Sequence, residues 1–167
     1  MNARPDHPNR RGSHASSGKS VSELESHLGY WLRFVSNHVA QAFQRKMEAA
    51  DVTVSEWVVM REMHRLGPTS PTELGQKIGM TKGAISKLVA RLERKELLIR
   101  SITEADRRNH VIELTIAGQT LVPALARLAD QNDEEFFGHL SKPVRDQLVS
   151  AMKEVVRLHQ LKAVPID

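Results

Sequence analysis

Apolar residues recur every three to four positions along most of the chain, whereas strand-like segments are confined to one short region. This helical spacing predicts amphipathic helices over residues 21–50, 54–66, 71–78, 82–95, 116–138 and 142–162. Two runs that are β-branched and apolar enough for strands, Leu98–Ile102 and Asn109–Leu114, bracket a short polar loop. The pattern therefore predicts a mainly α fold with one small β-hairpin.

The two central helices are predicted to meet at a tight turn. Ser70 and Glu73 can form a reciprocal capping box, and Pro71 suits the first helical position because its missing N–H costs nothing there. Gly79 follows the last apolar position of the first helix, where a left-handed residue commonly ends a helix. Thr81 can cap the second helix, so the chain turns and restarts within about three residues, as a helix-turn-helix requires.

The second of these helices has one apolar and one basic face. Its apolar stripe consists of Ile85, Leu88, Val89 and Leu92. Small residues on the opposite face let the backbone approach a large partner, and a major groove about 12 Å wide admits such a helix. Basic side chains there would neutralise phosphates while N-terminal side chains reach base edges. The DNA contacts expected from the two helices are Ser70, Thr72, Thr81, Lys82, Gly83, Ser86, Lys87 and Arg91.

The loop of the hairpin, TEADRR, carries Asp106, Arg107 and Arg108. Asp106 lies two residues before Arg108 and can hold that guanidinium in one rotamer by a charge-assisted hydrogen bond. A fixed arginine at a hairpin tip suits a minor groove, so these three residues complete the expected DNA site. The alternative is an ordinary surface ion pair of little energy. The position at a hairpin tip favours the DNA role.

These segments resemble the MarR-type (multiple antibiotic resistance regulator) family of winged helix-turn-helix transcription factors. The resemblance is carried by the helix pair TELGQKIGMTKGAISKLVARLERKEL and by the hairpin segment DRRNHVIELT. Positions that match the family pattern are Asp106, Arg108, Ile112, Leu114, Thr115 and Gly118. The likeness covers roughly residues 21–162, because the flanking helices also follow the order of the family.

The resemblance implies a single winged helix-turn-helix domain over residues 21–167, with its DNA-binding core at 70–115. It also implies a homodimer formed through long helices at 21–50 and 116–162, acting on a pseudo-palindromic operator, more often as a repressor. Long apolar stripes at both ends of the domain agree with a two-fold dimer interface. Their members are Leu24, Leu28, Trp31, Val35, Val39, Ala42 and Phe43, and then Val144, Leu148, Met152, Val155 and Leu158.

Capping residues set the expected ends of the remaining helices. Ser22 and Glu25 form a plausible capping box for helix 21–50, as do Thr53 and Glu56 for helix 54–66. Pro123 lies inside helix 116–138 and predicts either a kink or a later start of that helix. The acidic run of Asp130, Asp133, Glu134 and Glu135 is most simply a solvated face.

A small-molecule pocket is a further expectation. His38, Trp57, Met60, Arg61 and His64 would line it between the dimer helices and the DNA-binding lobe. Many members of the family bind a small aromatic or phenolic anion there, and an arginine beside aromatic rings suits such a ligand. The alternative places Trp57 and Met60 in the core and leaves Arg61 and His64 on the surface.

Composition and charge narrow the class of protein. The net charge of +4 is uneven, because residues 82–108 carry a surplus of basic residues and residues 1–20 carry another. A locally basic patch on an otherwise acidic body is the footprint of nucleic-acid binding. Residues 1–20 (MNARPDHPNRRGSHASSGKS) are expected to form a disordered basic tail that adds phosphate contacts or merely aids solubility. The apolar runs predict neither a membrane span nor a signal segment, so a cytoplasmic protein without a membrane partner is expected.

Other chemistries find little support. Zero cysteines exclude a thiol switch, and the eight histidines have no metal-binding spacing, so neither a metal nor a cofactor is expected. These are His7, His14, His27, His38, His64, His110, His139 and His159. No catalytic motif is present, so no enzyme is expected. The alternative function is a winged-helix module that docks proteins, although Lys82, Lys87 and Arg91 argue against it.

Overall fold

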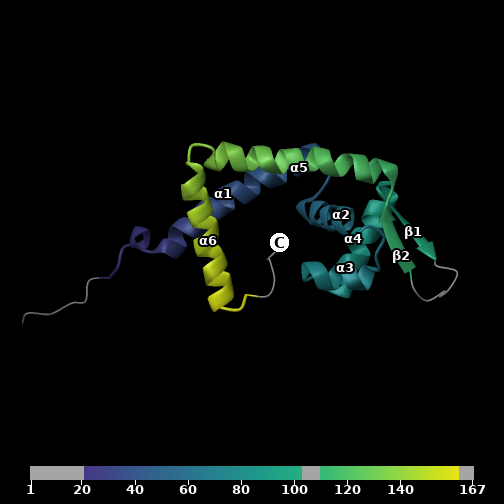
Figure 1. Cartoon of the computed structure of the whole chain (residues 1–167), viewed down its shortest axis with the longest axis horizontal. Helices are drawn as coiled ribbons and strands as arrows, with labels where there is room; N and C mark the ends of the chain where they lie inside the picture. Colours follow the sequence, from purple (N-terminus) through teal and green to yellow (C-terminus); the bar gives the residue numbers. More distant parts are fainter. Residues whose placement is uncertain (1–20, 103–109, 162–167) are drawn as a thin grey trace, which may run out of the picture.

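The computed structural model describes residues 21–102 and 110–161, and its elements match the predicted fold class (Figure 1). In chain order they are a 3-10 turn at Leu24–Ser26, α1 (Leu28–Ala49), α2 (Val54–Leu66), α3 (Pro71–Ile78), α4 (Lys82–Arg94), β1 (Leu98–Ile102), β2 (His110–Leu114), α5 (Ile116–Phe137) and α6 (Lys142–Leu158). The mainly α fold with a two-stranded antiparallel hairpin is thus confirmed. None of the described helices is long and apolar enough to cross a membrane.

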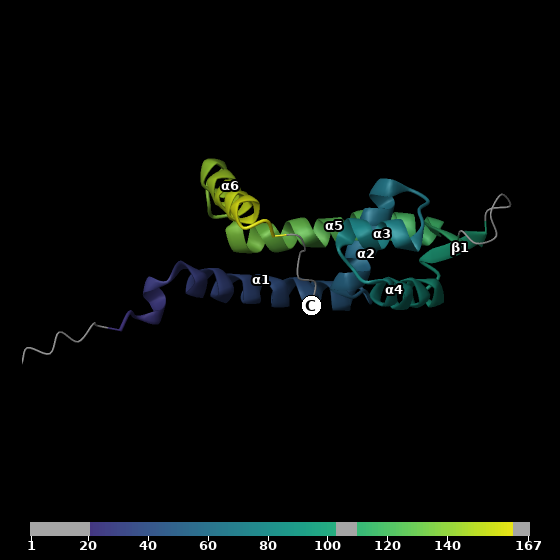
Figure 2. The same ribbon diagram turned by 90° about the horizontal axis from the view of Figure 1, so that it is seen from below.

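The helices divide into a long body and a lobe. α1 and α5 run antiparallel and pack against each other, as both views show (Figures 1 and 2). α2, α3, α4 and the hairpin form the lobe at one end of this pair, and α6 turns away from the other end of α5. The lobe is therefore attached to one end of the α1–α5 body, and the α3–α4 pair lies on the side of the lobe that faces away from this body.

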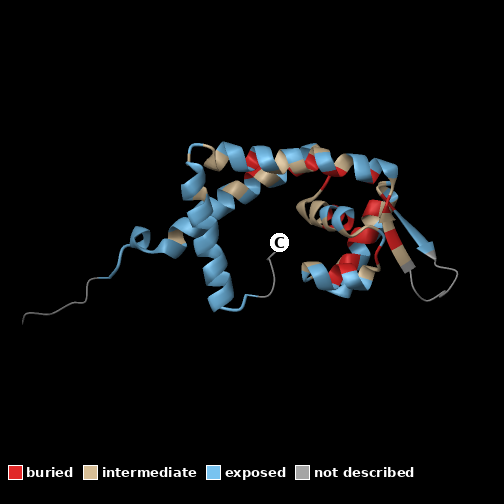
Figure 3. Ribbon diagram, in the orientation of Figure 1, coloured by how far each residue is buried: buried red, intermediate tan, exposed pale blue. Residues whose placement is uncertain are grey.

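The hydrophobic core lies in the lobe and where the lobe meets α1 and α5 (Figure 3). The predicted stripe of α4 is confirmed, because its four apolar residues are all buried. Fully burying a side chain of this size stabilises a fold by roughly 1.5–3 kcal/mol. The core consists of Met47, Val52, Val59, Met60, Met63, Leu74, Ile85, Leu88, Val89, Leu92, Leu98, Ile112, Leu114, Val122 and Leu125.

Capping residues place most helix starts where the sequence predicts them. Thr53 accepts from the Glu56 N–H, and the Glu56 carboxylate accepts from the Thr53 N–H, which completes the predicted capping box. Thr81 accepts from the Ala84 N–H at 3.3 Å and starts α4. Thr115 accepts from the Gly118 N–H at 3.1 Å and starts α5. Local sequence signals thus suffice for these three boundaries.

The predicted start of the first helix is wrong. α1 begins after His27, whose backbone is extended, and no side chain caps it. The preceding carbonyls are used by side chains instead: the Ser26 hydroxyl donates to the Glu23 carbonyl at 2.6 Å, and the Trp31 indole donates to the Glu25 carbonyl at 2.9 Å. Because these carbonyls bind side chains, the segment forms a short 3-10 turn rather than the first turn of a long helix.

Two smaller predictions also need correction. Ser70 caps α3 by accepting from the Glu73 N–H, but the Glu73 carboxylate accepts from the Thr69 hydroxyl at 3.1 Å, so the box is not reciprocal. α5 is continuous from Ile116 through Pro123, which overturns the later start considered for this helix. Pro123 comes seven positions after Ile116, so the helix is already established where the proline removes one N–H.

Candidate nucleic-acid interface

α3 and α4 cross closely at a glycine. A side chain at Gly75 would begin 3.2 Å from Ile85 Cγ1 and 3.2 Å from the Met80 carbonyl oxygen. Either contact is tight enough to push α4 outward, so the bare backbone of α3 sets the distance between the two helices. Gly79 then ends α3 in the left-handed conformation, with φ +71°, and the chain re-enters a helix at Lys82. This is the geometry of a helix-turn-helix.

The outer face of α4 is small at its N-terminus and basic further on. Thr81, Lys82, Gly83, Ser86 and Lys87 are all exposed, on the side opposite the buried stripe. The place where a Gly83 side chain would lie is open space, with no atom within 4 Å. The structure therefore brings these five predicted residues together on one accessible face.

The remaining predicted residues of the helix pair have mixed positions. Thr72 is exposed in the first turn of α3, whereas Ser70 is half-buried and its hydroxyl is engaged in the cap of that helix. Arg91 belongs to α4 but lies over the first turn of α2, where its Nε is 3.1 Å from Glu56 Oε1. Arg91 is therefore held by a protein carboxylate, with 42% of its side chain exposed.

Glu56 is a functional candidate that sequence reasoning missed, since its spacing indicated only a helix cap. Its side chain is 0% exposed. Oε2 accepts from the Thr53 N–H at 2.9 Å and from Lys95 Nζ at 3.2 Å. Burial raises the pKa of Glu56, but the Thr53 hydrogen bond and the Lys95 and Arg91 cations outweigh it, and the pKa lies below its ordinary value. The carboxylate is therefore charged and links α2 to the end of α4.

The hairpin is fixed to the helix pair from two sides. β1 and β2 pair antiparallel from Leu98 opposite Leu114 to Ile102 opposite His110. Thr69, just before α3, exchanges two backbone hydrogen bonds with Ile112, at 3.1 and 2.8 Å. The Glu93 carboxylate of α4 forms an ion pair with the guanidinium of Arg100 in β1, at 2.9 Å. The predicted tip residues Asp106, Arg107 and Arg108 lie outside the described residues.

The residues of the predicted pocket are not gathered around one cavity. Met60 is fully buried, Trp57 is half-buried against the core, and Arg61 is exposed. His38 lies on the exposed part of α1, with its ring 4.6 Å from that of Phe34. His64 lines a cavity of about 330 Å³ between the end of α2 and the hairpin.

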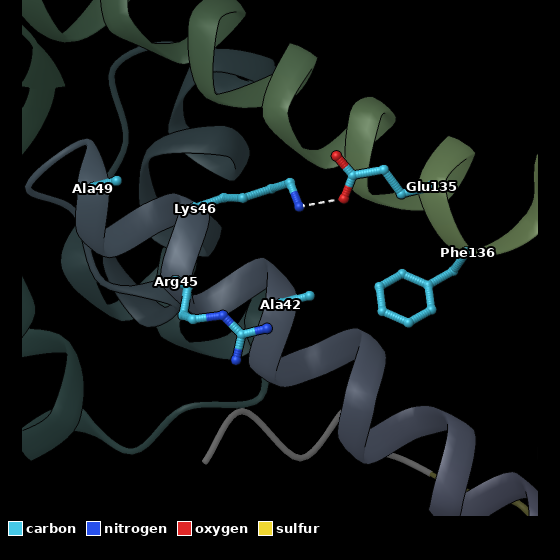
Figure 4. Close-up of a pocket in the computed structure, with 6 residues that line it drawn as sticks. All are labelled: Ala42, Arg45, Lys46, Ala49, Glu135 and Phe136. Atoms are coloured by element: carbon cyan, nitrogen blue, oxygen red, sulfur yellow. Dashed lines mark hydrogen bonds and ion pairs between the residues drawn. The ribbon is translucent and has the colours of Figure 1, made fainter.

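A larger cavity of about 480 Å³ lies between α1 and α5 (Figure 4). Its lining residues are Ala42, Arg45, Lys46, Ala49, Glu135 and Phe136. Lys46 Nζ is 2.6 Å from Glu135 Oε2 and donates to the buried Asn132 amide oxygen at 3.2 Å. The acidic run on α5 is exposed as predicted, but Glu135 also fixes Lys46, and Glu134 pairs with Arg145 at 3.3 Å. Within the described residues, no three His, Asp or Glu side chains are placed to hold a metal ion.

The fold and the exposed basic helix define a winged helix-turn-helix protein. Residues 52–110 match the model of the MarR family, which confirms the predicted resemblance over this part of the chain. A relative in Staphylococcus haemolyticus, the HTH-type transcriptional regulator SarZ, is 27% identical over 135 residues, which are 81% of this chain and 90% of SarZ. The prediction of a non-enzymatic protein is confirmed by such relatives, which are named as transcriptional regulators.

Solved structures show the same fold. The DNA complex of MepR from S. aureus has a TM-score of 0.68 and 23% identity, covering 78% of this chain and 97% of MepR. BpsR from Bordetella bronchiseptica, described with regulation of its DNA binding by 6-hydroxynicotinic acid, has a TM-score of 0.69 and 23% identity. That alignment covers 81% of this chain and 97% of BpsR.

Proposed function

We propose that this chain is a sequence-specific DNA-binding transcriptional regulator that acts as a homodimer on a pseudo-palindromic operator, as a repressor. One observation carries the proposal: the small and basic face of α4 is fully accessible, while its apolar face is fixed in the core behind α3. A protein-docking module would not need Lys82 and Lys87 beside a bare Gly83. A protein that binds a DNA duplex does need them, because lysines neutralise phosphates and a small residue lets the helix backbone approach the base edges.

In the proposed complex, α4 enters the major groove with its N-terminal half. Lys82, Ser86 and Lys87 contact phosphates and base edges there, and Thr72 reaches the backbone from α3. The hairpin tip, with Asp106, Arg107 and Arg108, contacts the adjacent minor groove. The hairpin is well placed for this, because Thr69 and Ile112 join it to the start of α3.

The proposed dimer forms through the two ends of the chain. α6 has no buried residue, and its apolar side chains Leu148, Met152 and Val155 are each about half exposed. The first half of α1 likewise exposes Leu28 and Trp31. Contiguous apolar surfaces of this length are unfavourable in water, and a second copy of the chain covers them symmetrically. Two α4 helices then approach successive major grooves about 34 Å apart.

A small aromatic anion is the proposed effector. The cavity between α1 and α5 offers the Arg45 guanidinium and the Phe136 ring on facing helices (Figure 4). A carboxylate would pair with Arg45 while its ring packs on Phe136. Occupation of this site changes how α1 packs on α5, and therefore how far apart the dimer holds its two α4 helices. The regulation of BpsR by 6-hydroxynicotinic acid supports this proposal.

The test is a gel shift with duplexes selected from a random pool by the wild-type protein. We expect the retained sequences to contain an inverted repeat. Arg108→Ala should weaken binding of the selected duplex by about tenfold or more, which corresponds to about 1–3 kcal/mol. Arg157→Ala, an exposed arginine of α6, serves as the control and should bind like wild type. A folded protein that retains no duplex but captures a protein through α4 would favour the docking module instead.

A further inference from the structure

Among the described residues, Glu56 is the only charged residue that is buried. A buried carboxylate is costly unless it is paired and hydrogen-bonded. Its hydrogen bonds all reach Oε2, from the Thr53 N–H and from Lys95. Oε1 accepts no hydrogen bond within the described part of the chain and is compensated only by the Arg91 charge at 3.1 Å. The site is therefore built to need both cations.

The two cations come from the far end of the proposed recognition helix. Arg91 lies in the last turn of α4, and Lys95 caps that turn four residues later, so both face the start of α2. Lys95 also donates to the backbone carbonyl of Asp51, at the turn before α2. Together with an ion pair between Lys95 Nζ and Asp51 Oδ1 at 3.7 Å, these contacts fasten the C-terminal end of α4 to the residues around the α2 N-terminus.

Among the cations of α4 and its C-cap, some are paired with a protein carboxylate and others, including the exposed Arg94, form no ion pair with a described residue. Lys82 and Lys87, in the N-terminal half, form no ion pair with any described residue and are exposed. In the C-terminal half, Arg91 and Lys95 share the Glu56 carboxylate. A cation that is already compensated by a protein carboxylate releases fewer counterions when a phosphate approaches it.

We infer that Glu56 is a positioning residue that sets the DNA specificity of α4: it withdraws Arg91 and Lys95 from phosphate binding and fixes the helix so that its N-terminal half reads the bases. The inference rests on the proposed function. It follows that the charge of Glu56 lowers affinity for unrelated DNA, which depends on the number of neutralised phosphates. The same charge raises affinity for the operator, which depends on the orientation of α4.

The experiment compares Glu56→Gln with wild type on two duplexes, the selected one and a scrambled one, over a range of NaCl concentrations. Glutamine keeps an oxygen that can accept from the Thr53 N–H, so the helix cap survives and only the charge is lost. Glu154→Gln is the matched control, because it also removes one carboxylate and frees one arginine, but on α6.

We expect the variant to bind the scrambled duplex more tightly, with a log–log salt slope steeper by roughly 0.9 for each cation released. Its preference for the selected duplex should fall by about tenfold, and Glu154→Gln should keep the wild-type preference and slope. An unchanged slope and preference in Glu56→Gln would overturn the inference. So would a parallel loss of both affinities, which a merely structural role predicts. A wild-type protein that binds no duplex overturns the proposed function itself, which separates the two failures.

A second pair of variants covers the case in which Glu56→Gln does not fold. Lys87→Gln should lower the salt slope on the scrambled duplex by about 0.9, because its charge is available to phosphates. Arg91→Gln, one turn further along α4, should leave that slope unchanged, because Glu56 already compensates its charge. If Lys87→Gln and Arg91→Gln lower the salt slope equally, the inference that Glu56 compensates Arg91 is refuted.

Discussion

Individual residues with unusual backbones show where the chain accepts strain. Glu96, between α4 and β1, adopts a left-handed conformation with φ +57°, and the Leu97 N–H donates to the Leu92 carbonyl at 3.0 Å to close the turn. A residue with a side chain is disfavoured in this region by roughly 1–2 kcal/mol. The chain tolerates this strained conformation at Glu96 because the turn directs β1 back across the lobe.

Replacing this residue by glycine should therefore stabilise the protein. We expect Glu96→Gly to raise the free energy of unfolding by about 0.5–1 kcal/mol, since the relieved strain exceeds the entropy cost of glycine. Gln76→Gly, at an exposed helical position of α3, should instead lower it by a similar amount. Urea denaturation measures both. A loss of stability in Glu96→Gly would show that the left-handed turn carries no strain.

The buried carboxylate of Glu56 predicts a particular dependence on pH. Because its pKa in the folded protein lies below the ordinary value of 4.5, the charged group stabilises the fold above that pH. This contribution disappears as the pH falls through the lowered folded-state pKa. We expect the stability difference between wild type and Glu56→Gln to be largest near neutral pH and to shrink in acid. Denaturant titrations across the acid range would measure it, and a constant difference would contradict the assignment.

At the scale of elements, local signals specify the lobe well. Thr53, Thr81 and Thr115 start their helices as predicted because a hydroxyl and a nearby N–H suffice to define each boundary. The start of α1 was missed because the Ser26 and Trp31 side chains take the carbonyls that a longer helix would use. Sequence spacing shows that a cap is available, but not whether a competing partner is nearer.

The junction between β1, β2 and α5 depends on one glycine. A side chain at Gly118 would clash with the Leu97 carbonyl oxygen and lie 3.2 Å from the Leu97 carbonyl carbon. Because these are backbone atoms, Gly118→Ala should lower the free energy of unfolding by about 1–3 kcal/mol.

Gly29→Ala provides the matched control for this prediction. No atom lies within 4 Å of the place where its side chain would be, so it should raise stability slightly through helix propensity, by about 0.5–1 kcal/mol. Thermal unfolding followed by circular dichroism would measure both variants. If Gly118→Ala is as stable as wild type, the close approach of α5 to Leu97 is wrong.

At the scale of the whole molecule, the sequence predicts which faces are apolar but not what lies opposite them. The stripes of α1 and α6 follow helical spacing as clearly as that of α4, yet the stripe of α4 is buried within the chain, whereas the stripe of α6 and the first half of that of α1 are exposed. The pairing of Glu56 with Arg91 and Lys95 could not be predicted from the sequence either, because residues 35 or more positions apart meet only after the core forms. Both features arise from tertiary or quaternary packing.

The exposed stripe of α6 predicts the behaviour of the chain in solution. Wild type should sediment at twice the chain mass of 18.8 kDa. Leu148→Asp places a charge in the proposed interface and should shift the protein toward monomers, whereas Gln147→Asp, its polar neighbour on α6, should remain dimeric. Sedimentation velocity distinguishes the species. A wild-type monomer would remove the proposed basis for recognising a pseudo-palindrome.

The geometry of the complex with DNA tests the central claim most directly. Hydroxyl-radical footprinting of the wild-type protein on the selected duplex measures where the two α4 helices bind. We expect two protected patches related by two-fold symmetry, with their centres about 10 base pairs (one helical turn) apart on the same face of the duplex. A single patch, or two patches on opposite faces, would contradict a homodimer that presents paired recognition helices to B-form DNA.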